Sequence, residues 1–314
     1  MRRTTPILLA LLLLLTGCTP KQVVDNPRIA VITMMQGGEF WGALKNGARS
    51  ARSATSAVLE FFGPINESDY EGQIACVQSA IDQGFDAIIL SPSHYTRLKD
   101  VVTKAQAKGI KVVLADTALM GQAADFLITA DYREIGAAMA TYAFTLFGED
   151  EAINALIIGS LPNTTTMTNL VESLSAALKT RPKSRIVSST FSLTDEAIAY
   201  DITSTALDGD PTINVVFALE EYTAGGVAPA IEDHPGVRFI ALGNTRYEIQ
   251  LLEESTIDAL VVVNAFNLGY RSVLAAVDLL EGKKPAQQPV DWALVTKESM
   301  FSEEHQRLLF QSIQ

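Results

Sequence analysis

Short apolar runs of strand length alternate with helical segments along nearly the whole chain after residue 28. The first apolar run covers residues 28–33; a Gly-containing turn follows at 36–38, and residues 40–51 have helical spacing. Parallel strands covered on both faces are continuously apolar, and each needs a crossover helix to reach the next strand. The alternation therefore predicts an α/β protein with parallel sheets.

The expected elements form two similar series, and 314 residues exceed the usual size of one compact core. In the first series, strands are expected at 28–33, 58–62, 87–90, 111–115 and 126–129, with helices at 40–51, 69–83, 95–108 and 132–147. In the second, strands are expected at 155–158, 185–189, 214–219, 238–242 and 258–264, with helices at 166–179, 194–207, 222–232, 246–254 and 268–281 and a closing strand at 291–296. The sequence thus predicts two Rossmann-like lobes joined without a long linker.

The N-terminus has the composition of an export signal. Arg2 and Arg3 precede the apolar run 7–15, which is far shorter than the roughly 20 residues of a membrane-spanning helix. Small residues follow at the expected cleavage point. Residues 1–17 are therefore predicted to be a signal peptide, and residues 18–27 a short polar tether.

Residues 15–18 (Leu-Thr-Gly-Cys) resemble the bacterial lipobox. This resemblance implies that Cys18 becomes the lipidated first residue of the mature protein, held at a membrane surface. The alternative is an ordinary signal peptide that ends near a cysteine. With Cys18 lipidated, Cys76 would be the single cysteine left, so no internal disulfide is expected, and its helical surroundings predict a buried, inert thiol.

Charge and motifs argue against two classes of function. The net charge of −12 disfavours a nucleic-acid binder, which needs clustered Lys and Arg. The three histidines, His94, His234 and His305, are scattered; only His94, which follows a strand, is a candidate to face a cleft. Because no metal-ligand spacing, nucleophile motif or phosphate loop occurs, we expect no metal, no cofactor and no enzymatic activity.

Several motifs in order along the chain resemble those of the type I periplasmic binding proteins, the ribose- and galactose-binding class that delivers solutes to ABC importers. They are the first strand with Phe40-Trp41, Gly63-Pro64 with Asp69 and Gln73, Ser91-Pro92-Ser93, residues 109–113 leading to Asp116, residues 129–132, and residues 258–262 followed by Asn264, Phe266, Gly269 and Tyr270. The resemblance implies a two-lobed fold with a three-crossover hinge that closes on a ligand. It assigns residues 28–130 plus 264–289 to an N-terminal lobe and residues 131–263 plus 290–314 to a C-terminal lobe.

The first β-α turn predicts ligand-facing residues on its own. Ligands of open α/β sheets bind beyond the carboxyl ends of the strands, so this turn would project Glu39, Phe40 and Trp41 towards a cleft. The resemblance adds that the two aromatic positions pack on a sugar ring and that Asp116 accepts hydroxyl hydrogen bonds. The alternatives are core aromatic residues and a carboxylate that caps a helix or turn.

Other ligand positions implied by the resemblance carry unusual residues here. Thr117 and the segment from Asn163 stand where ribose binders often have arginine, and Glu220 stands where Asn or Asp is frequent. Gly243 occupies a frequent ligand-aspartate position, with Asn244 as a possible substitute, and Asn264 is expected at the second crossover. The missing arginines disfavour an anionic ligand and leave a neutral polyol or a positively charged solute.

These observations predict a lipid-anchored, monomeric receptor, facing the periplasm or the cell exterior, for a sugar or polyol that it passes to an ABC permease. The alternative is a receptor of the same fold that signals occupancy to a membrane sensor kinase or chemoreceptor. An exported enzyme is disfavoured because neither a nucleophile nor a general base is recognisable.

Overall fold

The computed structural model describes residues 25–121 and 124–311. The predicted signal peptide, Cys18 and most of the predicted tether lie outside the described residues. No helix formed by the described residues is long and apolar enough to cross a bilayer.

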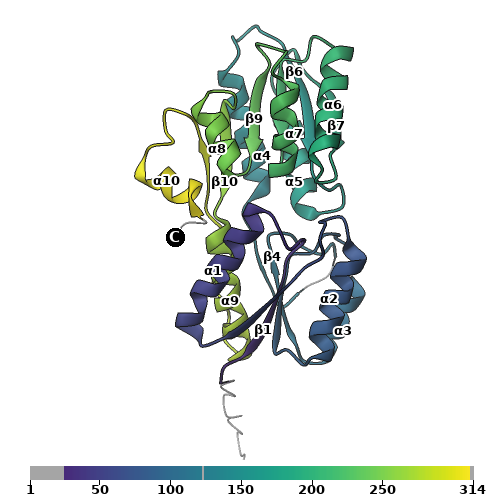
Figure 1. The fold of residues 1–314 in the computed structure, drawn as a ribbon, viewed down its shortest axis with the longest axis vertical. Helices are drawn as coiled ribbons and strands as arrows, with labels where there is room; N and C mark the ends of the chain where they lie inside the picture. Colours follow the sequence, from purple (N-terminus) through teal and green to yellow (C-terminus); the bar gives the residue numbers. More distant parts are fainter. Residues whose placement is uncertain (1–24, 122–123, 312–314) are drawn as a thin grey trace, which may run out of the picture.

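The N-terminal lobe is built on a five-stranded parallel sheet, shown in the lower half of Figure 1. Its strands are, in spatial order, β2 (Val58–Phe62), β1 (Arg28–Ile32), β3 (Ala87–Leu90), β4 (Lys111–Ala115) and β5 (Phe126–Ile128). The helices of this lobe are α1 (Glu39–Thr55), α2 (Tyr70–Asp82), α3 (Lys99–Ala107) and α9 (Ala265–Leu280). Ile29 and Val31 of β1 belong to one buried cluster with α1 and α9, and Ala30 and Ile32 to another with α2 and α3, so helices cover both faces of the sheet.

The C-terminal lobe is built on a six-stranded sheet. Its strands are, in spatial order, β11 (Trp292–Val295), β10 (Ala259–Val263), β9 (Arg238–Leu242), β8 (Val215–Ala218), β6 (Ile153–Gly159) and β7 (Ser184–Phe191). The helices of this lobe are α4 (Tyr132–Thr145), α5 (Thr165–Leu178), α6 (Glu196–Gly209), α7 (Glu221–Ala230), α8 (Arg246–Glu253) and α10 (Glu303–Leu309). All neighbouring strands are parallel except β11, which returns antiparallel to β10.

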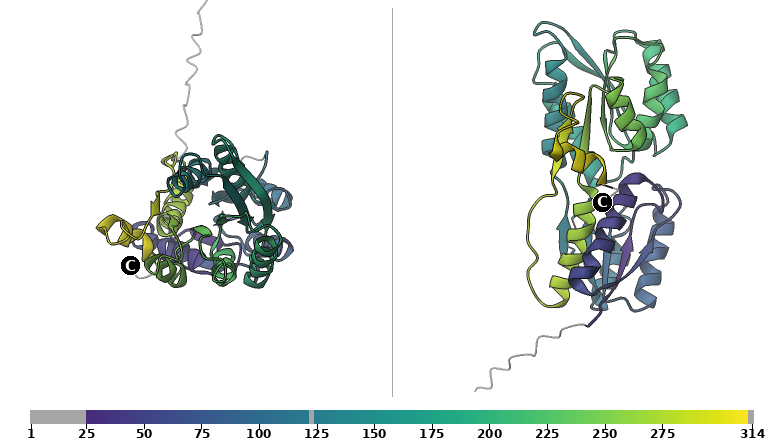
Figure 2. Two further views of the ribbon diagram at one scale, coloured as in Figure 1. Left: turned by 90° about the horizontal axis from the view of Figure 1, so that it is seen from above. Right: turned by 60° about the vertical axis from the view of Figure 1, so that its left-hand side comes forward.

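The chain passes between the lobes three times: from β5 to α4, from β10 to α9, and from α9 to β11. The last connection is the long yellow-green loop beside the molecule in the right-hand view of Figure 2. This arrangement confirms the predicted fold of two parallel-sheet lobes with a three-crossover hinge. The lobe boundaries assigned to individual residues stay predictions.

Two glycines allow α9 to pack closely on α1 after the second crossover. A β-carbon on Gly47 would overlap with the carbonyl oxygen of Phe266, and one on Gly269 would overlap with that of Leu44. Backbone approach of this kind is open only to glycine. The contact ties the returning helix to the helix that begins at the predicted site.

Three local expectations were wrong. The helix expected over 95–108 begins at Lys99, because the preceding residues form turns and the Tyr95 amide donates to Asn163 O of the other lobe, 2.7 Å away. Helix α10 was not expected; Ser302 caps it and it buries Leu308 and Leu309. The Cys76 thiol is half-buried instead of buried, although partial burial does raise its pKa.

Candidate ligand-binding site

A cavity lies between the two lobes and is lined by residues of both. The space inside it, counted together with the open solvent at its mouth, is about 660 Å³. Its lining consists of Met34, Phe40, Trp41, Glu67, Asp116, Tyr132, Ser160, Leu161, Thr164, Thr166, Met167, Leu170, Leu219, Glu220, Glu221, Leu242 and Gly243. The lining thus combines a large apolar wall with four carboxyl groups.

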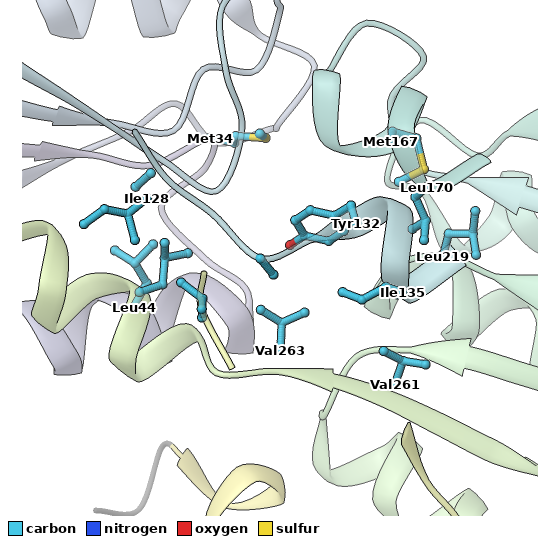
Figure 3. Close-up of a cluster of buried hydrophobic side chains, with 14 of the residues drawn as sticks. Met34, Leu44, Ile128, Tyr132, Ile135, Met167, Leu170, Leu219, Val261 and Val263 are labelled. Carbon is cyan, nitrogen blue, oxygen red and sulfur yellow. The ribbon is translucent and has the colours of Figure 1, made fainter. Parts of the chain in front are cut away.

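The apolar wall comes from both sides of the hinge. Figure 3 shows the ring of Tyr132 between Met34 of the N-terminal lobe and Met167 and Leu170 of the C-terminal lobe. On the N-terminal side the rings of Phe40 and Trp41 meet edge to face, with centroids 4.9 Å apart. A solute in this cavity must therefore present an apolar surface over much of its area.

Glu67 connects the aromatic wall to the opposite lobe. It lies in the loop after β2, is 7% exposed, and accepts hydrogen bonds from Trp41 Nε1 at 2.6 Å and from Thr194 Oγ1 of the C-terminal lobe at 3.2 Å. Burial raises the pKa of the Glu67 carboxyl above its usual value, against the opposing effect of these two hydrogen bonds. Each oxygen of a carboxylate can accept a further bond, so both stay available to a ligand.

Asp116 follows β4 and is held in an uncommon backbone conformation. Its φ is +71°, in the left-handed region that non-glycine residues rarely occupy, and such strain is concentrated at functional sites. Its Oδ1 accepts from Tyr132 OH at 2.5 Å, across the first crossover. Burial raises the pKa of Asp116 to about 6, although the Tyr132 bond lowers it.

Glu220 and Glu221 lie side by side at the carboxyl end of β8, and each meets a helix N-terminus. Glu220 caps its own helix α7, accepting from the amides of Tyr222 at 2.9 Å and Thr223 at 3.2 Å. Glu221 accepts from the amides of Glu39 at 3.1 Å and Phe40 at 3.4 Å, at the start of α1 in the other lobe. Burial raises the pKa of Glu220 well above its usual value and that of Glu221 to about 7, although these amide bonds favour the charged forms.

On another side of the cavity, the start of α5 is hydrogen-bonded to the segment after β4. Thr165 Oγ1 lies 2.9 Å from Thr117 Oγ1 and accepts from the Ala118 amide at 2.7 Å, while Thr166 Oγ1 donates to Asp116 O at 3.1 Å. Together with the Glu67–Thr194 and Glu221–α1 contacts, these bonds join the lobes around the cavity. The structure is therefore a closed arrangement of the two lobes.

Four of the predicted ligand residues line this cavity: Phe40, Trp41, Asp116 and Glu220. Their roles in binding stay predictions, because core packing and capping also apply: Trp41 is 4% exposed, and Glu220 caps α7.

The other predicted ligand residues do not line the cavity. Glu39 is exposed and contributes its backbone amide, and Thr117 and Asn163 make contacts between the lobes. Asn244 donates to Leu309 O in α10, and Asn264 caps α9 by accepting from the Asn267 amide. His94, also considered for the cleft, packs against Tyr70 and Tyr95 instead. The side chain of Asn244 is therefore engaged by α10, a helix that was not expected, and that of Asn264 by capping its own helix.

Sequence reasoning missed Glu67, Glu221 and Tyr132 as cavity residues. Glu67 lies in a loop of polar residues, and nothing in that loop's sequence distinguishes it from neighbours that face solvent. Glu221 directly follows Glu220, which was the residue predicted to bind the ligand. Tyr132 belongs to the motif at the first crossover, so its place in the motif was the available signal. Which of these side chains turns inward depends on the position of the opposite lobe.

A fifth carboxyl, that of Glu248, lies behind Gly243 at the edge of the cavity. A β-carbon on Gly243 would overlap with both carboxyl oxygens of Glu248, so this side chain fills the space beside the glycine. Glu248 is fully buried; its Oε2 accepts from Thr245 N at 2.8 Å and Thr245 Oγ1 at 2.9 Å. Its Oε1 has no hydrogen-bond partner among the described residues.

Replacing Glu248 with glutamine should stabilise the protein in alkaline solution. Burial raises the pKa of Glu248 from 4.5 to about 8, so between these pH values the folded state keeps a proton that the unfolded state has lost. The contribution of Glu248 to the free energy of unfolding therefore falls as pH rises through this window, by about 1.4 kcal/mol per unit of pKa shift. In thermal melts, Glu248→Gln should match wild type at pH 5 and melt several degrees higher at pH 9.

Glu253→Gln, which changes an exposed carboxylate on the same helix, is the matched control and should show no such pH-dependent difference. If the melting temperature of Glu248→Gln equals that of wild type at every pH from 5 to 9, the raised pKa of Glu248 is contradicted.

Comparison with known proteins agrees with this two-lobed geometry. The profile of the periplasmic binding protein domain family matches residues 29–284, most of the chain. The protein belongs to the periplasmic binding protein family. Members of this family are binding proteins, and the predicted kinship with its type I class is confirmed.

Individual relatives are distant. The D-allose-binding periplasmic protein of Escherichia coli (strain K12) is 21% identical over 285 residues, covering 85% of this chain and 91% of that protein. Among solved structures, an ABC transporter solute-binding protein from Agrobacterium vitis with bound D-fucose has a TM-score of 0.84 at 24% identity and covers 90% of this chain and 100% of its own. A XylFII–LytSN complex contains a chain that matches with a TM-score of 0.80 at 23% identity. The match covers 87% of this periplasmic binding protein and 99% of the chain in that complex. At these identities the structural matches establish the fold.

Proposed function

We propose that this protein is an extracytoplasmic solute receptor that encloses one small polar solute between its lobes and presents it to an ABC-type importer. The observation that carries this proposal is the cavity itself, lined from both lobes and bordered by hydrogen bonds that join one lobe to the other. A solute that contacts both lobes stabilises the closed state by its differential affinity for that state. The importer would then distinguish closed from open receptors.

A sugar or polyol is the first candidate for the carbon skeleton of the solute. The sugar-binding relatives support this choice, as do the aromatic pair and the carboxylates, because a sugar ring has an apolar C–H face and a rim of hydroxyl donors. We expect no catalytic activity, since binding between lobes needs no reactive group. We also expect a monomer, because one chain supplies the whole lining.

The proposal is tested by native mass spectrometry of the gently purified protein together with small-angle X-ray scattering. One bound small molecule per chain, and a smaller radius of gyration with that solute than after it has been removed by partial unfolding and dialysis, are expected. Conversion of the solute into a product, or an identical radius in both states, would contradict the proposal.

We also propose that Cys18 carries a lipid anchor, on the basis of the lipobox-like sequence at residues 15–18. Cys18→Ser should move the protein from the membrane fraction to the soluble fraction, because a single polar substitution removes the lipid attachment point. Fractionation followed by immunoblotting measures this change, with Cys76→Ser as the control that should stay in the membrane fraction. A Cys18→Ser protein that stays with the membrane would exclude the anchor.

A sensory role is the second candidate, and the similarity to the XylFII–LytSN complex favours it. Both roles need the same closure on the same solute. Pull-down of the solute-bound receptor with the purified importer permease, compared with a purified sensor domain, separates them.

A further inference from the structure

The four carboxyl groups of the cavity have no basic side chain beside them in the lining that the described residues form. The lining contains Glu67, Asp116, Glu220 and Glu221, and among the described residues it contains no Lys, Arg or His. None of the effects that shift the pKa values of these four groups comes from a basic residue. A buried carboxylate without a partner is costly, so these groups must be neutralised by protons or by a cation.

Two features show that the part of the chain that the structure describes does not itself supply a cation to these groups. First, the two helix N-termini compensate Glu220 and Glu221 only partly, because each supplies about half a unit charge. Second, the described residues that donate to the Glu67 and Asp116 side chains are neutral: the Trp41 indole, Thr194 and Tyr132.

The cation is not a simple metal ion in this geometry. Among the described residues, no three His, Cys, Asp or Glu side chains lie close enough together to hold a metal. The carboxyl groups instead surround a space walled by Phe40, Leu161, Leu170 and other apolar side chains. That wall requires an organic body on the solute.

The lining is also poor in free donors. Thr166 Oγ1 already donates to Asp116 O, whereas Thr164 Oγ1 accepts from the Met167 amide and keeps its own hydroxyl hydrogen for a solute. The Trp41 and Tyr132 donors are engaged by Glu67 and Asp116. A matching solute therefore brings more N–H and O–H donors than acceptors, as an ammonium group with its three donors does.

We infer that the solute of this receptor is an organic cation, with a primary ammonium group facing the Glu67–Glu220–Glu221 carboxyls and a ring or chain with an apolar face against Phe40 and Trp41. This inference rests on the proposed function and specifies its solute class. An amino sugar and an arylalkyl amine both combine an ammonium group with an apolar face, and they differ in their carbon skeleton. An ammonium within the carboxyl cluster is favoured over a hydroxyl, because charge-assisted hydrogen bonds are about twice as strong as neutral ones.

The test is isothermal titration calorimetry of the wild-type protein at pH 7 with two matched pairs. D-glucosamine is compared with D-glucose, and 2-phenylethylamine with 2-phenylethanol, so that only the ammonium group changes within each pair. We expect the amine to bind at least tenfold more tightly than its neutral partner in one or both pairs. The pair in which binding is seen distinguishes an amino sugar from an arylalkyl amine. A neutral partner that binds as tightly as its amine, or no binding of either amine, would overturn the inference.

Proton linkage provides a second readout. A cation stabilises the charged forms of Asp116 and Glu221, whose pKa values are raised to about 6 and about 7, so its binding should release protons and its affinity should rise from pH 5 to pH 7. The other titratable groups facing the cluster are Glu39 on α1, Glu67 after β2, Tyr132 on α4, Glu220 and Tyr222 at the start of α7, and Glu248 on α8. All of these are acidic groups, so none reverses the sign. Titrations in buffers of different ionisation enthalpy measure the released protons.

A charge-removing variant completes the design. Glu67→Gln should reduce the preference for the amine over its neutral partner at least fivefold, whereas Glu71→Gln, an exposed change on α2, should leave it unchanged. A preference that survives in Glu67→Gln overturns the assigned role of the cluster. If instead D-glucose closes the lobes and the amines do not, the inference fails while the proposed solute receptor stands; if scattering shows no closure with any bound solute, the proposed function itself fails.

Discussion

Replacing Trp41 with alanine is expected to weaken solute binding at least about thirtyfold, equivalent to a loss of roughly 2 kcal/mol. Trp41 contributes to the cavity in two ways: its ring forms part of the lining, and its Nε1 holds the Glu67 carboxyl at 2.6 Å. The alanine variant loses both the aromatic surface and the donor that orients Glu67. Calorimetry with the solute that copurifies with the wild-type protein measures the effect.

Trp41→Phe separates the two contributions. Phenylalanine keeps an aromatic ring beside Phe40 but cannot donate to Glu67, so an intermediate affinity is expected. Because Trp41 is only 4% exposed, the alanine change also costs about 3–5 kcal/mol of folding stability, and thermal melts must show that the variant is folded at the temperature of the titration. Wild-type affinity in both folded variants would remove Trp41 from the site.

Replacing Thr165 with valine is expected to weaken binding about tenfold or more without altering the cavity lining. Thr165 does not line the cavity, but its hydroxyl bonds the start of α5 to Thr117 and to the Ala118 amide of the other lobe. Losing it leaves these groups without their partner in the closed state, at a cost of about 1–3 kcal/mol. Because these bonds join the two lobes, moving the lobes apart breaks them, so their loss disfavours closure and lowers the apparent affinity.

Faster dissociation, measured by stopped-flow fluorescence, together with a larger radius of gyration at a fixed solute concentration, would show the shift. Thr168→Val is the matched control, because the Thr168 hydroxyl bonds only within the same helix, to Thr164 O. Equal dissociation rates in the two valine variants would show that closure does not depend on the Thr165 contact.

The acidic cavity also explains why the class of protein is better defined by sequence than its solute. Distant relatives that bind D-allose or D-fucose share the two-lobed frame at 21–24% identity. The lining is a small set of side chains within that frame, and Glu220, Gly243 and Glu248 together form a local arrangement that fold similarity does not describe. A solute must therefore be argued from the charges and surfaces of this cavity.

The order and type of nearly all helices and strands followed from the sequence alone, and so did the two-lobed fold. Alternating apolar runs and helical periodicity are local signals, and the buried strands β3 and β4 leave no polar face that would permit another assignment. The aromatic pair at the start of α1 was expected at the cavity because the carboxyl ends of parallel strands share one edge, whereas Asp116 after β4 was expected there from the family resemblance; both line the cavity. Helix α10 escaped prediction because only seven residues carry its pattern.

Only the tertiary structure decided which polar side chains turn inward. Glu67 reaches Thr194 and Glu221 reaches the start of α1 across more than a hundred residues of sequence, and neither contact exists within one lobe. Asn244 and Asn264, by contrast, form hydrogen bonds with backbone groups instead of lining the cavity. Asn244 donates to Leu309 O in α10, and Asn264 accepts from the Asn267 amide at the start of α9. Local patterns determine how each lobe folds, whereas the binding surface arises from how two lobes approach each other, and that approach has no periodic signature in the sequence.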